Sequence, residues 1–238
     1  MKMLRNFTIR FVMLTILGIF CVMWAGVGLY STWSLSRVSD GNDVDRQLVR
    51  QMTVLSQGND QYFRFVTRLS RAMEVKAAGG TPDLAPAQQA LDNMSKKLAE
   101  MKAISPGPMD EKVSAQVIST WQALLDRGVT PQMAQAKQAT LEGYRQHANN
   151  VTPPLSRAFG SAAENFNNTA AKALDSTRVV VDGLTSMTRT VIITATIVGL
   201  LILLFTDRYL VAILVKPLDR IRQQFRQIAQ GDLSQPIE

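Results

Sequence analysis

The residues best suited to binding a charged small molecule are three arginines, Arg64, Arg68 and Arg71. On a helix, steps of four and three place them within about 60° of one another, so they form one basic stripe. A guanidinium group binds a carboxylate through two parallel hydrogen bonds. Arg64 and Arg71 have acids nearby in the sequence, Asp60 and Glu74, whereas Arg68 has none. A solvated face with local ion pairs is therefore the alternative interpretation of the stripe.

Thr152 is the fourth candidate for a ligand contact. It precedes Pro153 and Pro154 at the predicted start of a helix, where threonine caps the backbone and unpaired amides favour anions. The two prolines remove two of those amides, which weakens this attraction. In an up-down bundle, that helix start lies at the same end as the last turns of the arginine helix. We therefore predict a carboxylate site formed by the three arginines and Thr152, with a purely structural cap as the alternative role of Thr152.

Other kinds of site have little support in the sequence. His147 is the only histidine and has no cysteine or carboxylate cluster beside it, so we expect no metal ion. No Ser/His/Asp set, paired acids or glycine-rich phosphate loop occurs, so we expect neither a cofactor nor enzyme activity. Tyr62, Phe63 and Phe65 could line an aromatic pocket, but Tyr62 falls on an apolar seam and is better explained as core.

Two uncharged runs predict membrane spans on either side of this region. Residues 11–30 contain no charge, and a helix of that length covers a hydrocarbon core about 30 Å thick. The second run, 190–205, is slightly short and is lengthened by its uncharged neighbours. A cleaved signal peptide is the alternative for the first run. However, its length and the flanking Trp24, Tyr30 and Trp33 favour a retained anchor, and the bulky Phe20 before Cys21 argues against a lipoprotein site.

Basic residues predict the orientation of the two spans. Lys2, Arg5 and Arg10 precede the first, and five arginines or lysines follow the second, so both termini are expected in the cytoplasm. We predict a cytoplasmic N-terminus over 1–10, spans over 11–30 and 190–206, an extracytoplasmic domain over 31–189 and a cytoplasmic segment over 207–238. The domain carries 18 basic and 15 acidic side chains, a balance too mild to indicate nucleic acid. It contains no cysteine, so packing alone must hold it together.

The domain reads as four amphipathic helices. Apolar residues recur at steps of three and four from Leu48 to Met73, from Leu84 to Met101, from Val113 to Leu124 and from Leu155 to Met187. The Gly79-Gly80-Thr81-Pro82 and Ser105-Pro106-Gly107-Pro108 runs end the first two. We expect the third helix to break at residues 128–131, to resume with Thr130 as its cap and to end near His147. The fourth is expected to start at Thr152. The prediction is an all-α, up-down-up-down bundle whose first and last helices continue into the spans.

Small residues predict a second copy of the chain against the first span. Gly18, Cys21, Ala25 and Gly28 form a stripe that another helix could approach closely, with ordinary lipid-facing sequence as the alternative. The seam of the fourth helix is also thin at Ser176 and Gly183, which indicates either loose packing there or room for a partner subunit. We expect a homodimer.

The segment after the second span resembles the first helix of a HAMP domain, the two-helix signal converter of bacterial receptors. The resemblance rests on Lys216-Pro217-Leu218, Ile228-Ala229 and Gly231-Asp232-Leu233. The order span, four helices, span and HAMP resembles methyl-accepting chemotaxis proteins of the Tar/Tsr type. Within the first helix, Leu69-Ser70-Arg71 resembles the motif that carries a ligand-binding arginine in that family. Val66 and Val75 occupy the positions of the other family arginines, so the identity of the ligand does not carry over.

This resemblance implies a transmembrane chemoreceptor in the inner membrane. Its expected partners are a small organic or amino-acid carboxylate or a periplasmic binding protein outside, membrane lipid, and a cytoplasmic kinase and adaptor inside. The sequence reaches only Glu238, so we expect it to be a piece of a longer protein. The same sensor on a histidine kinase or cyclase is one alternative. A structural membrane protein whose bundle binds another protein is the other.

Overall fold

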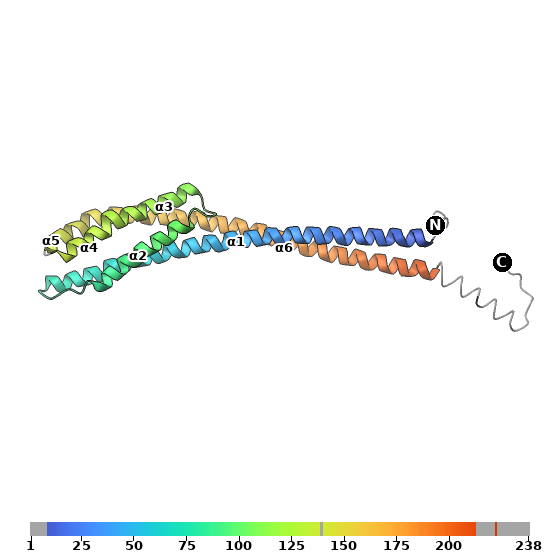
Figure 1. Cartoon of the computed structure of the whole chain (residues 1–238), viewed down its shortest axis with the longest axis horizontal. Coiled ribbons are helices and arrows are strands. Elements are labelled where there is room, and N and C mark those ends of the chain that lie inside the picture. Colours follow the sequence, from blue (N-terminus) through green and yellow to red (C-terminus); the bar gives the residue numbers. More distant parts are fainter. Residues whose placement is uncertain (1–8, 139, 213–221, 223–238) are drawn as a thin grey trace, which may run out of the picture. The chain divides into compact units, whose positions relative to one another are not determined.

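The computed structural model describes residues 9–138, 140–212 and 222, and every regular element among them is helical. The described elements are α1 (Ile9–Ala77), α2 (Ala85–Ile104), α3 (Glu111–Ala123), η2 (Leu124–Val129), α4 (Thr130–Lys137), α5 (Leu141–Gln146), η3 (His147–Val151) and α6 (Thr152–Leu210). Figure 1 labels the α-helices. The predicted all-α class is confirmed. The predictions for Lys2 and Arg5 and for the HAMP motifs lie outside the described residues.

The chain divides into two compact units, and α1 and α6 supply residues to both. One unit, called the membrane pair below, combines Met1–Val38 with Asp182–Glu238. The other, called the bundle, is Ser39–Val181. The predicted continuity of the first span with the first helix is confirmed, because α1 passes without a break through Asp40-Gly41-Asn42.

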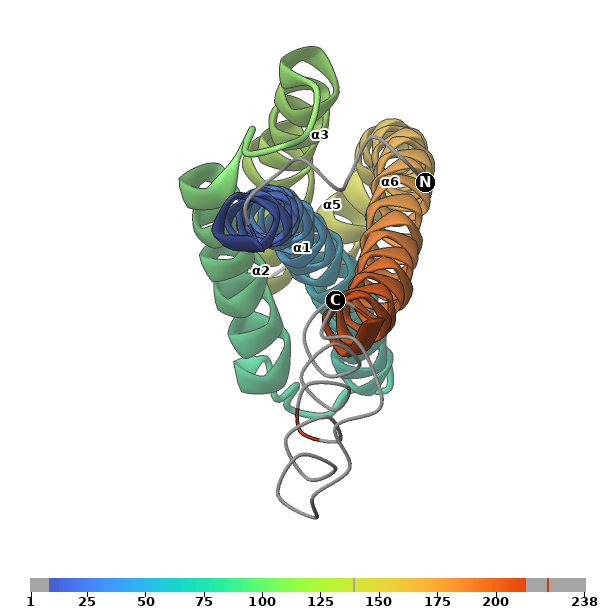
Figure 2. The ribbon, with the colours of Figure 1, turned by 90° about the vertical axis from the view of Figure 1, so that its right-hand side faces the viewer.

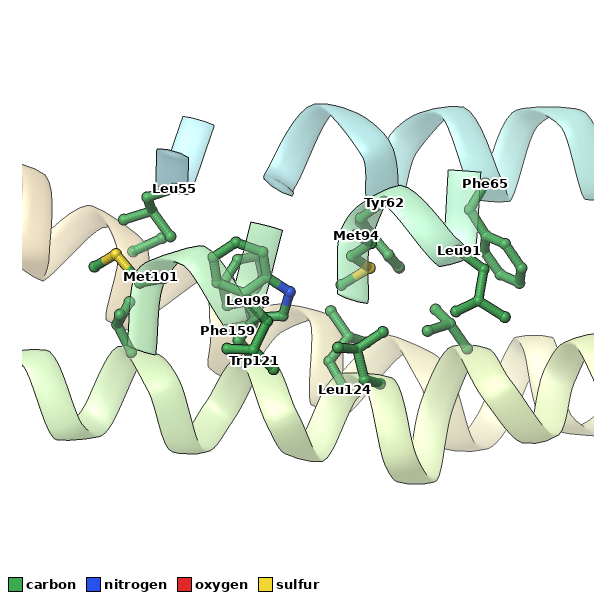
Figure 3. Close-up of a cluster of buried hydrophobic side chains, with 14 of the residues drawn as sticks. Leu55, Tyr62, Phe65, Leu91, Met94, Leu98, Met101, Trp121, Leu124 and Phe159 are labelled. Carbon is green, nitrogen blue, oxygen red and sulfur yellow. The ribbon is translucent and has the colours of Figure 1, made fainter. Parts of the chain in front are cut away.

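The bundle has four helical columns, which Figure 2 views nearly end-on. They are the second half of α1, then α2, then α3 continued by η2 and α4, and finally α5 continued by η3 and the first part of α6. Trp121 and Phe159 lie at the centre with ring centroids 5.3 Å apart, and side chains from every column surround them (Figure 3). Most positions of the predicted seams fill this core, but Val180 and Met187 at the end of the fourth seam are exposed. Tyr62 and Phe65 are buried in the core whereas Phe63 is exposed.

The predicted ends of the third and fourth helices were wrong. No break occurs at residues 128–131, and Thr130 has helical backbone angles and caps nothing. The two columns are instead separated between Lys137 and Leu141, where Gln138 and Thr140 are extended, so the fourth column begins at Leu141 and not at Thr152. The third column accordingly ends at Lys137, well before His147.

Two π-helical segments explain why the prolines do not end these helices. The segment η2 ends two residues before Pro131, and η3 ends two residues before Pro153. A proline inside an α-helix clashes with the carbonyl four residues earlier and offers no N–H. The wider i→i+5 turn changes the hydrogen-bond register just before each proline, so the column continues past it.

The membrane pair consists of one apolar segment from α1 and one from α6. These two helices alone among the described residues are long and apolar enough to cross a membrane, with mean hydropathies of 2.3 and 2.2 over their most apolar windows. Gly199 packs against Phe20 and Met23, and Ser34 Oγ lies 2.6 Å from Thr188 Oγ1. Most other large apolar side chains of the pair are exposed, as expected for a surface that lipid covers.

Candidate ligand site

The three arginines of the predicted stripe lie on the outside of α1 and reach different partners. Arg64 donates from Nε to Asp60 Oδ2 at 2.6 Å, the local ion pair that the sequence offered as the alternative. Arg68 donates from Nη1 to the carbonyl oxygen of Pro86 at 3.0 Å, which ties α1 to the start of α2. Arg71 is exposed and makes no hydrogen bond or ion pair with any described residue, including Glu74. Its guanidinium is the one in the stripe that remains available.

Thr152 lies in the interior of the bundle. It is 3% exposed, and its Oγ1 donates to Gln132 Oε1 at 2.8 Å. Its backbone angles are helical, with φ −67° and ψ −39°, and its N–H donates to the His147 carbonyl, so η3 leads into α6 without a free helix N-terminus at Thr152. The structure therefore places Thr152 on a buried bond between columns and does not join it to the three arginines. That the four residues bind a ligand stays a prediction.

Hydrogen bonds between columns gather where the two π-helical segments meet. The ring Nε2 of His147 lies 2.9 Å from the carbonyl oxygen of Gly128. The bond between Thr152 and Gln132 joins the same two columns a few residues further along each chain segment. A π-helical turn leaves carbonyls without their usual α-helical donors, so side chains from the facing column can satisfy them. His147 therefore has a structural role. Sequence reasoning missed Gln132, whose only signal is a polar residue among buried neighbours.

A cavity of about 190 Å³ lies between the last turns of α1 and the first turns of α5. Its lining combines apolar, hydroxyl and charged side chains: Ser70, Met73, Glu74, Ala77, Leu141, Tyr144 and Arg145. The sequence prediction missed Arg145 because it placed the start of the fourth column eleven residues too late. A helix start predicted at Leu141 would have placed Arg145 on the fourth column, opposite the end of α1.

The charged groups elsewhere in the bundle form surface links. The hydrogen bond from Lys97 holds the pKa of the Glu100 carboxyl below its usual range, and the positive charge of Arg50 acts in the same direction. Glu100 joins α1 to α2 through Arg50 and lies outside the cavity. Among the described residues, no group of three or more histidines, cysteines and acids could hold a metal ion.

Comparison with known proteins identifies both parts of the chain. Residues 3–174 match the family described as "Tar ligand binding domain homologue", and residues 209–238 match the HAMP domain. No curated protein matches. The solved N-terminal ligand-binding domain of a putative methyl-accepting chemotaxis protein from Salmonella enterica is 65% identical, with a TM-score of 0.55. The match covers 56% of this chain and 98% of that one.

These matches agree with the helix order and with the two apolar segments. Receptor sensory domains and HAMP domains are not enzymatic domains. The chain belongs to the Tar ligand-binding domain homologues and, with its HAMP segment, is a transmembrane chemoreceptor of the Tar/Tsr type.

Proposed function

We propose that this receptor senses a small organic or amino-acid carboxylate outside the inner membrane, with both termini in the cytoplasm. The observation that carries the proposal is the continuity of α6, which runs from Thr152 in the bundle to Leu210 in the membrane pair. A ligand that prefers one packing of the bundle columns shifts the population toward that packing. A continuous helix then carries the difference to the HAMP segment and to cytoplasmic kinase control.

The arginine stripe supports a carboxylate as the ligand. Arg71 offers an exposed guanidinium with no described partner, and the bond from Arg68 ends on the uncharged carbonyl oxygen of Pro86, which a carboxylate could replace. A carboxylate carries a negative charge and can accept two parallel N–H bonds from one guanidinium, whereas a carbonyl carries no charge. The buried Thr152 would act through the packing of the columns and not by touching the ligand.

Binding by the whole chain in lipid nanodiscs tests this proposal. A panel of organic acids and amino acids is titrated and followed by calorimetry and by the melting temperature of the bundle. We expect at least one carboxylate to bind, and Arg71→Ala and Arg68→Ala to weaken its affinity about tenfold or more, as for the loss of a charged hydrogen bond. Arg157→Ala removes an exposed guanidinium of α6 and is the matched control. A carboxylate that binds all three variants equally would contradict the placement at the stripe.

We also propose that the receptor works as a homodimer. On α1, the small-residue stripe faces away from the residues that pack against α6, and nothing lies within 4 Å of a methyl group placed on Gly18 or Gly28. In the bundle, Phe63 is 58% exposed on α1. Both features leave room for a second copy, since small residues let membrane helices approach and large exposed apolar groups favour burial.

Cys21, which is exposed on the stripe, reports on the dimer. Mild oxidation of native membranes should join two chains through Cys21. A cysteine moved to position 22 in a Cys21→Ala background turns about 100° around the helix and should react more slowly. If both positions cross-link equally, or if position 21 does not cross-link, the small-residue stripe does not lie at the two-fold axis of the dimer.

A further inference from the structure

A groove of about 610 Å³ runs between α1 and α6 in the membrane pair. It is lined by residues between positions 31 and 38 of α1 and between positions 185 and 193 of α6, so it crosses the ends of both predicted spans on the side of the bundle. Tyr30 and Trp33, with ring centroids 6.0 Å apart, lie on the same stretch of α1, and such aromatic side chains sit at the level of lipid headgroups. The groove therefore lies where headgroups meet acyl chains.

Polar and apolar side chains line the groove in the order of a phospholipid. Ile192 and Ile193 follow Arg189 by three and four residues, so they lie on the same face of α6, one turn deeper in the bilayer. On the α1 side, the half-buried Ser31 forms no hydrogen bond with a described residue. A phospholipid presents a phosphate, then ester carbonyls and then acyl chains in the same direction.

Arg189 gives the groove a positive charge that nothing in its lining compensates. It is exposed, makes no hydrogen bond or ion pair with any described residue, and is the one charged side chain among the described residues that line the groove. The nearest acid along α6 is Asp182, two turns away or about 10 Å along the axis. A guanidinium group binds a phosphate through two parallel hydrogen bonds, so a phosphate suits this position.

A second copy of the chain suits this groove less well than a lipid. At about 100° per residue, the α1 positions that line the groove (31, 34, 35 and 38) lie on a face centred roughly 110° from the small-residue stripe. Segments 9–38 and 183–206 contain no aspartate or glutamate, so the spans of a second copy have no acid to pair with Arg189. Covering an unpaired guanidinium with apolar side chains costs free energy. A lipid phosphate supplies the missing charge.

We propose that this groove binds one anionic phospholipid from the leaflet on the side of the bundle, with its phosphate on Arg189 and one acyl chain against Ile192 and Ile193. Ser31 donates to an ester carbonyl of the same lipid. Sites for small molecules have volumes of about 300–1,000 Å³, so the groove holds a phosphate and one chain while the second chain stays in the bilayer. Because the lipid contacts both helices, binding favours the packing in which α1 and α6 lie close at this level. The site is independent of the ligand proposed for the bundle.

Native mass spectrometry of the whole chain tests the headgroup preference. The receptor is released from detergent micelles that contain equal amounts of phosphatidylglycerol and phosphatidylcholine with the same acyl chains. No described acid lines the groove, so the choline ammonium would lie unpaired near Arg189, and we expect phosphatidylglycerol to be retained about tenfold more. Equal retention of the two lipids would overturn the proposal.

Two arginine variants then locate the lipid. Arg189→Gln should lower the retention of phosphatidylglycerol about tenfold or more, because it removes a charged hydrogen bond. Arg37 is the matched control, since its guanidinium lies 5.8 Å from the centroid of the Trp33 ring and does not line the groove. Any exposed arginine near the headgroups attracts anionic lipid weakly, so Arg37→Gln should lower retention by about threefold or less. Equal losses in the two variants would show general surface attraction and overturn the site.

Circular dichroism melts of both variants check the fold. If Arg189→Gln alters the melt, Arg189→Lys keeps the charge and should retain more phosphatidylglycerol than Arg189→Gln does. Retention in Arg189→Lys as low as in Arg189→Gln would then count against a charge-based site.

Cross-linking distinguishes a lipid from a second copy in the groove. Ser31→Cys in a Cys21→Ala background places a thiol in the lining. With a lipid in the groove, two chains are held apart there, and mild oxidation of native membranes should give no disulfide between chains. A disulfide through position 31 would mean that a second copy covers the groove, and the proposal would fail.

Discussion

The bundle and the membrane pair are built from the same two long helices, α1 and α6, yet they bury different side chains. The bundle core holds large groups, with Trp121, Phe65, Phe159 and Phe166 almost fully buried. The membrane pair buries Ser34, Ala195 and Gly199 and leaves most of its leucines and isoleucines exposed.

The solvent around each unit explains the difference. In water, removing a large apolar side chain from the solvent is the main stabilising term, so the bundle gains from aromatic groups at its centre. Lipid tails are as apolar as leucine, so large side chains gain nothing by leaving them. Helices in lipid associate through close approach at small residues and through hydrogen bonds. The same kind of substitution should therefore change stability by different amounts in the two units.

The largest expected effect is the loss of a central aromatic group. Trp121→Ala should cost about 3–5 kcal/mol of bundle stability, because it removes a fully buried ring and leaves a cavity against Phe159. Trp33→Ala in the membrane pair removes a ring that is 51% exposed and should change stability by less than about 1 kcal/mol. Thermal unfolding of the whole chain in detergent, followed by circular dichroism, measures both. Equal losses would contradict the distinction between the units.

Substitution of a buried glycine in the bundle should give the next largest effect, and an exposed glycine serves as its control. A methyl group on Gly58 would lie 2.0 Å from two ring carbons of Trp121, so α1 approaches α3 this closely only because position 58 has no side chain. We expect Gly58→Ala to cost about 1–3 kcal/mol through overpacking. Gly160, exposed in α6, has nothing within 4 Å of an added methyl, and Gly160→Ala should stabilise the helix by roughly 0.5–1 kcal/mol. Melting temperatures that fall for both variants would show that the clash at Gly58 is not the cause.

The apolar pattern of the sequence was sufficient to predict the class and most of the core. The seam positions from Leu48 to Met73 and from Leu84 to Met101 are largely buried, and the glycine and proline runs after them end α1 and α2 as expected. These signals are local, because periodicity and backbone breakers act within a few residues. Trp121 lies within the apolar pattern predicted from Val113 to Leu124, but its close approach to Gly58 joins residues far apart in the sequence, which no local pattern indicates.

The end of the third column and the start of the fourth were predicted wrongly because proline was taken to mark a helix boundary. Pro131 and Pro153 are accommodated by the π-helical turns before them, and such turns have no clear sequence pattern. The error moved the start of the fourth column and with it the candidate site. It placed Thr152 at a helix N-terminus and left Arg145 unnoticed. The arginine stripe itself was found, since Arg64, Arg68 and Arg71 do share one outer face of α1.

A buried hydrogen bond in the bundle should have a moderate effect. Thr152→Val keeps the shape of the side chain but leaves Gln132 Oε1 buried without its donor, which should cost about 1–3 kcal/mol. Adding Gln132→Leu should recover part of the loss, because both polar groups are then gone. Thr67→Val removes an exposed hydroxyl that donates to its own helix and should change stability by less than about 0.5 kcal/mol. A double variant less stable than Thr152→Val alone would mean that Gln132 has another role.

The smallest expected effect is the corresponding bond in the membrane pair. The Thr188 hydroxyl also lies 2.8 Å from the Leu184 carbonyl and donates to it, so Ser34 is the donor in the bond between the two helices. A double-mutant cycle with Ser34→Ala and Thr188→Val should give a coupling of about 0.6 kcal/mol, since the separated helices find other partners in lipid. The cycle is measured by reversible unfolding in mixed micelles. A coupling as large as the loss from Thr152→Val would mean that the membrane pair depends on polar hydrogen bonds as strongly as the bundle does. The difference between the two units would then lie only in the aromatic core of the bundle.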